Sequence, residues 1–396
     1  MREAVIVASV RTPGARAKRG SLVNTRADVI GLTAIEGCMS KVPQVTKEMV
    51  DDFVVGCSFP EAEQGLNIGR VLVQLAGFPD SVPGMVVNRF CSSGLQAIAL
   101  AAQNIMVGWN DIVLAGGVES MTRVPMGGFI NRPHPDWTDK YPDVYMSMGS
   151  TAENVANRYN ISREEQDEFA VRSNSLAAEA QDKGYFDDEI VPITEAVKYR
   201  VDENGKRVKE FFTFDADDGV RRGTSVESLG KLRPAFWKNG SVTAGNSSQM
   251  TDGAAATLLM SREKAEELGI KPIARFVNYQ VVGVRPDEMG VGPRYAIPKV
   301  LQKSGFETKD IDYFEVNEAF ASQAIYSLKE NGLDKRLDDV NVCGGAIALG
   351  HPLGCTGAKL TATCIHQMRR RGNKRGIVSM CIGGGMGAAG IIELED

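Results

Sequence analysis

The sequence predicts an α/β protein made of two similar halves, and three observations support this prediction. Short apolar runs alternate with longer segments whose apolar residues recur every three or four positions, which is typical of strands followed by helices in a largely parallel sheet. Two segments of the first half have counterparts in the second half at a nearly constant spacing. The chain has 396 residues, of which 43% are hydrophobic and 24% charged, so it is long enough for two or three sizeable cores.

Each expected element rests on its own run of residues. Strands are expected where apolar runs are short and bounded by turn residues, and helices where the apolar period is three to four. The expected strands cover residues 4–8, 53–55, 85–87, 112–115, 256–260, 273–277, 313–316, 377–380 and 390–394. The expected helices cover residues 28–39, 93–107, 295–304, 319–329 and 356–370.

The two halves look like copies of one unit. Val50-Asp-Asp-Phe-Val-Val parallels Ile311-Asp-Tyr-Phe-Glu-Val, and Asp111-Ile-Val-Leu-Ala parallels Gly376-Ile-Val-Ser-Met. Both pairs lie about 261 to 265 residues apart, so the register holds. A tandem duplication explains this pattern, and chance similarity of strand–helix units is the alternative. We expect a first domain of residues 1–121 plus 251–272 and a second domain of residues 273–396.

Residues 122–250 interrupt the repeat and have a different character. The stretches 182–189 and 199–206 are polar and rich in turn residues. One helix start is clear, because Ser162 and Glu165 form the sequence pattern of a capping box. We expect this inserted domain to be ordered and to cover a site.

Charge and cysteine content argue against several classes of function. The formal net charge of -5 gives no support for a main role in binding nucleic acid or an anionic membrane. Seven irregularly spaced cysteines without a Cys-x-x-Cys pair, and only three histidines, predict reduced thiols and no metal site. The apolar runs are too short for a membrane span or a signal peptide, which predicts a cytoplasmic protein.

Cys91 is the first candidate catalytic residue. It stands in Asn-Arg-Phe-Cys91-Ser-Ser-Gly, between the strand expected at 85–87 and the helix expected at 93–107. Free N–H groups and the positive end of the helix dipole favour a thiolate there, so the position suits a nucleophile. A buried structural thiol is the alternative, since free cysteine packs as a small apolar residue.

His351 is the candidate base. The glycines and the proline of Leu-Gly-His351-Pro-Leu-Gly indicate a specified turn rather than a helix face. Imidazole titrates near neutrality and can take a proton from a thiol. A lone histidine is otherwise more often a surface or satisfied core residue.

Cys381 and Asn317 lie at two further strand ends. Cys381 enters Ile382-Gly383-Gly-Gly, where a thiol could act as acid in one half-reaction and as base in the other, with free N–H groups for an oxyanion. A glycine-rich strand end that only lets two backbones pack closely is the alternative. Asn317 follows the strand at 313–316, either as a helix cap or as a side chain that holds a water molecule.

These motifs resemble those of the thiolases. The likeness covers essentially the whole chain and includes the segments 115–121, 231–236 and 243–248. The resemblance implies two similar α/β domains in a five-layer α-β-α-β-α stack with an inserted loop domain. It also implies that coenzyme A and acyl-CoA are substrates, with no tightly bound cofactor.

The resemblance implies a role for each candidate residue. Cys91 is expected to become acylated, with His351 as its activating base. Cys381 is expected to exchange a proton with the departing or incoming group. Asn317 is expected to hold a water that stabilises one oxyanion together with His351, and the N–H groups of Cys91 and Gly383 are expected to form a second oxyanion hole.

The coenzyme A contacts of the family map mainly onto the inserted domain. They correspond here to Met148, Arg221, Ser228, Phe236, Ala244, Ser248 and, from the second half, Phe320. A basic residue for phosphates and apolar cover for the pantetheine arm fit these residue types. Arg222 could assist Arg221 or could be a solvated surface charge.

One departure from the family pattern bears on the substrate. Members specialised for acetoacetyl-CoA usually have histidine where this chain has Ser147, before Met148-Gly149. We therefore expect thiolytic cleavage of 3-ketoacyl-CoA in fatty acid β-oxidation, through an acyl-Cys91 intermediate. An acetyl-CoA acetyltransferase that condenses two acetyl-CoA molecules, and a non-catalytic acyl-CoA or lipid-binding protein, are the alternatives.

The resemblance also implies an assembly. A homodimer or homotetramer is expected, and a multifunctional β-oxidation partner is compatible with the family. We expect no nucleic-acid partner and no membrane span. The absence of a peroxisomal address favours the cytoplasm of a bacterium.

Overall fold

Ten of the twelve strands in the described residues form the main sheet of the protein. A computed structural model describes residues 2–395 and orders nine strands as β10-β11-β12-β9-β1-β8-β5-β3-β4, with β2 paired to β8. The strands are β1 (Ala4–Arg11), β2 (Ala15–Arg16), β3 (Asp52–Gly56), β4 (Met85–Val87), β5 (Ile112–Ser120), β8 (Thr251–Ser261), β9 (Ala274–Gly283), β10 (Tyr313–Val316), β11 (Arg375–Ile382) and β12 (Met386–Leu394). Every expected strand is present, and most are longer than expected.

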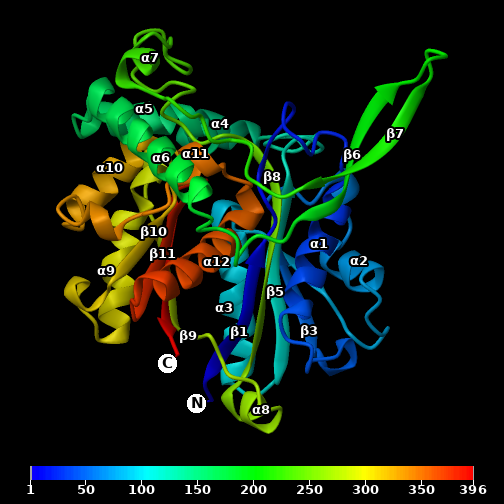
Figure 1. Cartoon of the computed structure of the whole chain (residues 1–396). Helices are drawn as coiled ribbons and strands as arrows, with labels where there is room; N and C mark the ends of the chain where they lie inside the picture. The colour runs from blue at the N-terminus through cyan, green and yellow to red at the C-terminus, as the bar shows by residue number, and fades with distance from the viewer. Residues whose placement is uncertain (1, 396) are drawn as a thin grey trace.

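Helices connect the strands and cover both outer faces (Figure 1). Those of the two halves are α1 (Ala27–Ser40), α2 (Ile68–Leu75), α3 (Ser93–Met106), α8 (Arg262–Glu267), α9 (Gly292–Ser304), α10 (Ala321–Glu330), α11 (Ala346–Leu349) and α12 (Leu353–Arg371). The five helices expected from the apolar period are all present, with ends shifted by at most three residues. The ranges of α2, α8 and α11 were not predicted, because apolar residues over eight positions or fewer do not distinguish a short helix from a strand or turn, even though Ile68, Leu72 and Val73 of α2 follow the helical period.

The expectation of a largely parallel sheet is wrong. Within residues 2–395, β3 pairs in parallel with β4 and β5, and β10 with β11, whereas the other six pairs of this sheet are antiparallel. The strands β11 and β12 are joined by Gly383, Gly384 and Gly385 alone. A connection of that length makes a hairpin, since parallel neighbours need a crossover of a dozen or more residues.

The two halves share one topology, which confirms the prediction of a duplicated unit. The strands β3-β5-β8-β1 of the first half correspond, in this order, to β10-β11-β12-β9 of the second half. Each pair of neighbouring strands runs in the same relative direction in both halves. The counterpart of β4 is a single parallel bridge between Phe314 and Val340. The segments matched by sequence are β3 with β10 and β5 with β11. The exact domain boundaries stay a prediction.

Alternating side chains on the strands define five layers. On β5, Ile112 and Leu114 join a buried cluster with α1 and α2, whereas Val113 and Ala115 face the opposite cluster, which contains α3 and α12. The strands of the second half contribute to this same middle cluster and, on their other face, to a third cluster with α9 and α10. The order is therefore helices, sheet, α3 with α12, sheet, helices.

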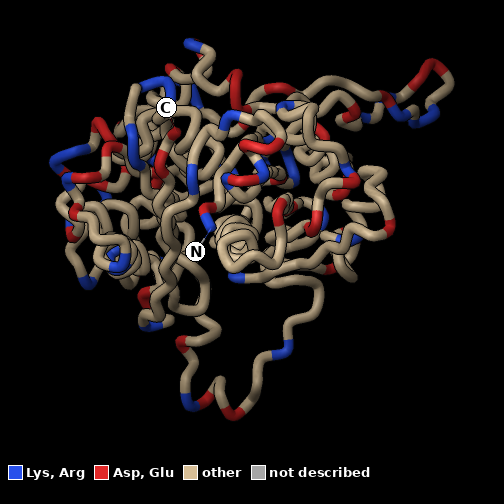
Figure 2. The backbone as a smooth tube through the Cα atoms, turned by 90° about the horizontal axis from the view of Figure 1, so that it is seen from below, with Lys and Arg blue, Asp and Glu red and all other residues tan. Residues whose placement is uncertain are grey.

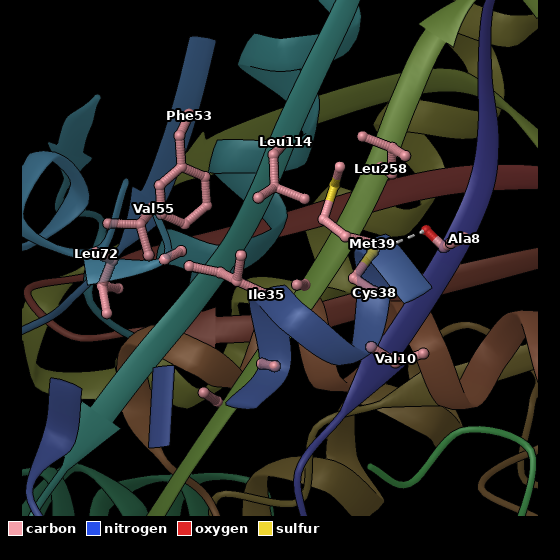
Figure 3. Close-up of a cluster of buried hydrophobic side chains, with 14 of the residues drawn as sticks. Ala8, Val10, Ile35, Cys38, Met39, Phe53, Val55, Leu72, Leu114 and Leu258 are labelled. Carbon is pink, nitrogen blue, oxygen red and sulfur yellow. Dashed lines mark hydrogen bonds between the residues drawn. The ribbon is translucent and has the colours of Figure 1, made fainter. Parts of the chain in front are cut away.

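The outer core of the first half shows how these layers are held (Figure 3). Ile35 and Met39 of α1 point toward Leu114 of β5 and Leu258 of β8, whereas Cys38 points toward Ala8 of β1, and all of these residues are buried. Burying an apolar side chain of this size contributes about 1.5–3 kcal/mol. Burial also raises the pKa of Cys38 to about 12, so this thiol is inert.

The inserted segment lies across one end of the layers (Figure 1). It contains α4 (Pro135–Lys140), α5 (Met148–Arg158), α6 (Arg163–Asp182), β6 (Ile193–Val201), β7 (Arg207–Phe214) and α7 (Val226–Gly230). The capping box of Ser162 and Glu165 is present at the start of α6. The expectation of a turn over 199–206 is wrong at its start, because Tyr199 pairs with Lys209 in the projecting β6–β7 hairpin.

A buried ion cluster fastens this segment to the first half. Arg11, at the end of β1, is fully buried. Its Nε donates to Glu189 at 2.5 Å, and its two terminal nitrogens donate to the oxygens of Asp217 at 2.8 and 2.9 Å. Thr363 of α12 also donates to Glu189 at 2.9 Å. The cluster therefore joins β1, the inserted segment and the middle helix layer.

Two features that the described residues lack bear on function. None of the helices in the described part of the chain is long and apolar enough to cross a membrane. Among the same residues, no group of three or more His, Cys, Asp or Glu is placed to hold a metal ion.

Candidate active site

Cys91 stands in a strained turn that leads into the middle helix layer. It belongs to a one-turn 3₁₀ helix, Phe90–Ser92, directly before α3. Phe90 has a φ of +42°, which is unfavourable for a residue with a side chain. The hydroxyl of Ser93 accepts the N–H of Arg89 at 2.9 Å and donates to the carbonyl of Phe90 at 2.6 Å. Strain held in place by such bonds is typical of functional sites.

His351 occupies the matching place in the second half, two residues before α12. Gly350 has a φ of +81°, and a Cβ on it would lie 2.1 Å from Oγ1 of Thr251, so only glycine fits. The N–H of His351 donates to the carbonyl of Gln249 at 3.0 Å. The buried Lys359 of α12 donates to the carbonyls of Leu349 and Gly350 at 2.7 and 3.0 Å. The turn before the imidazole is thus fixed from both sides.

One hydroxyl selects the tautomer of His351. Oγ1 of Thr356 lies 2.5 Å from Nδ1 of His351 and donates its hydrogen to the carbonyl of Pro352 at 3.0 Å. Because the hydroxyl has one hydrogen, its oxygen accepts the proton on Nδ1. Nε2 then carries the free lone pair, at 3.4 Å from Nδ2 of Asn317. This assignment makes Nε2 the basic atom of the site.

Asn317 lies at the end of β10 beside this imidazole. Its N–H donates to the carbonyl of Ser379 at 2.9 Å, and its carbonyl accepts from Gln323 at 2.9 Å. Its side-chain Oδ1 is buried and has no hydrogen-bond partner among the described residues. The cap alternative is wrong, because α10 begins at Ala321 with Phe320 as its N-cap. An unpartnered buried oxygen is free to bind water or substrate.

Cys381 and Gly383 complete the cluster from β11 and the turn after it. Cys381 is fully buried, and burial followed by the nearby Cys91 raises the pKa of its thiol well above the usual value. The N–H of Gly383 forms a hydrogen bond with the Cys91 thiol. Gly384 and Gly385 have φ values of +80° and +87° and carry the chain into β12. The structure therefore brings all five predicted catalytic residues together.

Burial decides the ionisation of the resting site. It raises the pKa of Cys91 to about 12, although the N–H groups of Gly383 and Cys91 act in the opposite direction. The N–H groups therefore favour a thiolate, as expected, but burial outweighs them in the free protein. Burial and then the charge of Lys359 lower the pKa of His351 to about 3. The site rests as a neutral thiol beside a neutral imidazole.

The buried imidazole predicts acid sensitivity of the fold. The pKa of His351 is lowered from 6.5 to about 3, so between these values the unfolded chain binds a proton that the folded protein does not. Stability therefore falls as pH falls below about 6.5, by up to about 1.4 kcal/mol per pH unit. Urea unfolding at pH 7 and pH 5 should show a smaller loss in His351→Gln than in the wild type. Equal losses would contradict this assignment.

A cavity of about 480 Å³ leads from Cys91 and His351 to the surface. Six of the seven predicted coenzyme A contacts line it: Met148, Arg221, Phe236, Ala244, Ser248 and Phe320. The rings of Phe236 and Phe320 meet edge to face at 6.0 Å. Ser228 does not line the cavity, because it is exposed and forms a reciprocal cap with Ser225 at the start of α7.

Sequence reasoning missed several residues of the site. Thr356 and Lys359 were not singled out, although two polar residues on the buried face of an apolar helix were a usable signal. The basic run from Arg16 to Arg19 also lines the cavity and was visible as a charge pattern. Met121, Met126, Met289 and Leu353 of the wall carried no signal, because single apolar residues do not distinguish a pocket from a core.

Comparisons with known proteins give a consistent result. The model described as "Thiolase, N-terminal domain" matches residues 4–263, and "Thiolase, C-terminal domain" matches residues 270–394. The chain is 52% identical to the 3-ketoacyl-CoA thiolase of Bacillus subtilis (strain 168), with 100% of both chains covered. It is 48% identical to the peroxisomal 3-ketoacyl-CoA thiolase A of Mus musculus, covering 99% of this chain and 91% of that one.

Solved structures agree with these sequence matches. The Bacillus anthracis acetyl-CoA acetyltransferase has a TM-score of 0.88 and 41% identity, covering 100% of this chain and 99% of that chain. The dimeric peroxisomal thiolase of Saccharomyces cerevisiae has a TM-score of 0.88 and 40% identity, covering 100% of this chain and 98% of that chain.

Proposed function

Because the chain belongs to the thiolase family, we propose that its catalytic site is that of a 3-ketoacyl-CoA thiolase. The residues of this site are Cys91, His351, Cys381, Asn317 and Gly383. The enzyme cleaves 3-ketoacyl-CoA with coenzyme A and yields acetyl-CoA and a shortened acyl-CoA, as in fatty acid β-oxidation. The observation that carries the site assignment is that the thiol of Cys91 and the imidazole of His351, with its basic Nε2, line one cavity, while the buried thiol of Cys381 lies near Cys91.

The first half-reaction forms an acyl-enzyme. Nε2 of His351 takes the proton of Cys91, and the sulfur attacks the ketone carbon of the substrate. The N–H groups of Cys91 and Gly383 stabilise the resulting oxyanion. When the carbonyl reforms, the carbon–carbon bond breaks, and the electron pair passes to the departing acetyl-CoA. The thiol of Cys381 protonates that carbanion, whose thioester oxygen is stabilised by His351 and a water held by Asn317.

The second half-reaction restores the enzyme. The thiolate of Cys381 takes the proton of coenzyme A, whose sulfur attacks the acyl group on Cys91. The carbon–sulfur bond to Cys91 breaks, and the imidazolium of His351 returns its proton to that sulfur. Each residue therefore ends in the protonation state in which it began. Two half-reactions through one covalent intermediate require ping-pong kinetics.

The covalent intermediate can be trapped. The enzyme is mixed with a 3-ketoacyl-CoA in the absence of free coenzyme A, and its peptides are analysed by mass spectrometry. We expect the acyl group on the peptide that contains Cys91. An acyl group on any other cysteine, or no acyl group, would contradict the mechanism.

The acetyltransferase alternative has one supporting observation, since a solved neighbour is named an acetyl-CoA acetyltransferase. Against it stands Ser147 at the position where acetoacetyl-CoA enzymes usually carry histidine. Comparing kcat/KM for thiolysis of acetoacetyl-CoA with that for a long-chain 3-ketoacyl-CoA separates the two. A preference for acetoacetyl-CoA would favour the alternative.

Thr356→Val should impair the base without unfolding the protein. Without an acceptor for the Nδ1 proton, the tautomer with hydrogen on Nε2 becomes competitive, so kcat should fall about 10- to 100-fold. Thr356→Ser keeps the acceptor and should recover most of the rate. Nitrogen NMR of the imidazole should show the change of tautomer. An unchanged kcat in the valine variant would show that Thr356 does not position the base.

We further propose a homo-oligomer that acts in the cytoplasm without a tightly bound cofactor. The dimeric state of the Saccharomyces cerevisiae neighbour supports the oligomer, and the bacterial relative supports the location. Light scattering distinguishes a dimer from a tetramer, and the mass of a single chain in solution would contradict both. Co-purification with a multifunctional β-oxidation enzyme tests the partner expectation.

A further inference from the structure

The wall of the active-site cavity carries charge of one sign only. Arg16, Lys18, Arg19 and Arg221 line it, and among the described residues no Asp or Glu does. The chain as a whole has a net charge of -5, and both signs are spread over its backbone in Figure 2. The cavity is therefore a local concentration of positive charge on an acidic protein, which favours an anionic ligand.

The loop that supplies three of these cations is rigid. Arg16 ends β2, which pairs with β8. The carboxylate of Asp218 accepts the N–H groups of Arg16 and Ser21, each at 2.7 Å. The N–H of Lys18 donates to Oγ1 of Thr122 at 2.7 Å, and Lys18 has a φ of +64°. The backbone is thus held in an unfavourable conformation, which is a feature of ligand-binding loops.

The cationic groups of this loop face the cavity without a carboxylate partner in the described part of the chain. Within residues 2–395, the side chains of Arg16, Lys18 and Arg19 make no ion pair, and Arg221 only donates to the carbonyl of Ala244 at 3.3 Å. Burial, followed by the charge of Arg16, lowers the pKa of Arg221. The two guanidinium groups therefore repel each other across the cavity wall. A bound anion would relieve that repulsion.

Arg222 shows the contrast. It is the direct neighbour of Arg221 but does not line the cavity, and it forms an exposed ion pair with Asp182 at 2.9 Å. The sequence could not separate these two arginines. The structure separates a surface charge that has its own carboxylate from one that faces the ligand space.

We propose that Arg16, together with Lys18 and Arg19, joins Arg221 in binding a phosphate group of coenzyme A. This inference rests on the proposed function. The reacting thiol of the ligand must reach Cys91 at the buried floor, so the phosphates at its other end lie toward the exposed Lys18 and Arg19 at the mouth. Guanidinium groups bind phosphate oxygens through paired N–H donors. The first half of the chain, and not the inserted segment alone, then holds the nucleotide end of the substrate.

The test compares two acyl acceptors in the thiolysis assay. Coenzyme A and pantetheine present the same thiol arm, but pantetheine has no phosphate. In Arg16→Gln, the KM for coenzyme A should rise about five- to tenfold, while kcat and the KM for pantetheine stay unchanged. Arg16→Lys should recover part of the loss. Arg222→Gln is the matched control and should leave both KM values unchanged.

A binding measurement keeps the inference separate from the catalytic proposal. Calorimetry with adenosine 3′,5′-bisphosphate should show weaker binding to Arg16→Gln than to the wild type, and weaker binding to both at high salt. If Arg16→Gln does not fold, the exposed pair Lys18→Gln and Arg19→Gln replaces it. Equal KM increases for both thiols, or unchanged affinity for the bisphosphate, would overturn the inference. If the wild type shows no thiolysis but binds the bisphosphate more tightly than Arg16→Gln does, the proposed function is overturned and this inference is not.

Discussion

Replacing Cys91 with alanine is expected to lower kcat for thiolysis by about 10⁴-fold or more while the protein stays folded. Cys91 is the only cysteine in the cavity wall, among the described residues, and the other thiols are buried behind it or elsewhere in the layers. The thiol of Cys381 does not line the cavity and has the separate role of exchanging a proton with the leaving or entering group, so we do not expect it to replace Cys91 as the nucleophile. Without Cys91 the enzyme has no group to hold the acyl chain between the two half-reactions.

The matched control is another buried cysteine. Cys364 packs in the middle layer on α12 and does not line the active-site cavity. Cys364→Ala should keep kcat and lose only a modest amount of stability. Steady-state rates with a 3-ketoacyl-CoA and the calorimetric Tm of both variants give the comparison. Near wild-type thiolysis by Cys91→Ala would refute the covalent mechanism.

Arg11→Met should be strongly destabilising, lowering the free energy of unfolding by about 3–5 kcal/mol. Glu189 and Asp217 would lose their common cation while staying buried. Burial alone would raise the pKa of Asp217, but the charge of Arg11 and then of Lys359 holds that pKa below its usual value. In the variant the pKa of Asp217 rises, so the folded state binds a proton that the unfolded state releases.

The sign of the pH effect separates this explanation from a simple packing defect. Because the folded variant holds the extra proton, its deficit relative to the wild type should grow as pH rises from about 4 toward 7. Urea unfolding at several pH values measures the deficit. Arg26→Met removes an exposed ion pair with Asp28 and should change stability by less than about 1 kcal/mol. A deficit that does not depend on pH would point to lost packing instead.

Much of the fold could be predicted because its signals are local. The capping box at Ser162 and the apolar period of α12 act through neighbours in the sequence, and the resemblance of β3 to β10 needed only a comparison of two short segments. Strand direction could not be predicted in this way. The turn at Gly383 can be recognised as a hairpin only if β12 is known to begin at Met386. The apolar pattern placed the start of this strand at residue 390, which leaves a longer connection.

In the candidate site, too, features that depend on neighbouring residues could be predicted and features that depend on distant contacts could not. Cys91, His351 and Cys381 could be found because glycines and strand ends mark them in the sequence. Their ionisation could not, since the pKa values of Cys91 and His351 depend on burial by segments far away in the chain. The roles of Thr356 and Lys359 likewise depend on contacts made only after α12 packs against the turn before it.

The equivalent positions of Cys91 and His351, each two residues before a middle-layer helix, have a consequence for the origin of the enzyme. Equivalent elements of the two repeats touch each other: β1 pairs with β9 antiparallel, and α3 packs with α12. Contacts between like parts are those of a twofold dimer. In an ancestral dimer of one unit, any side chain at this position faced its own copy across the axis. Once the two units were fused into one chain, the two equivalent positions no longer had to carry the same residue. One position could then become the nucleophile and the other its base.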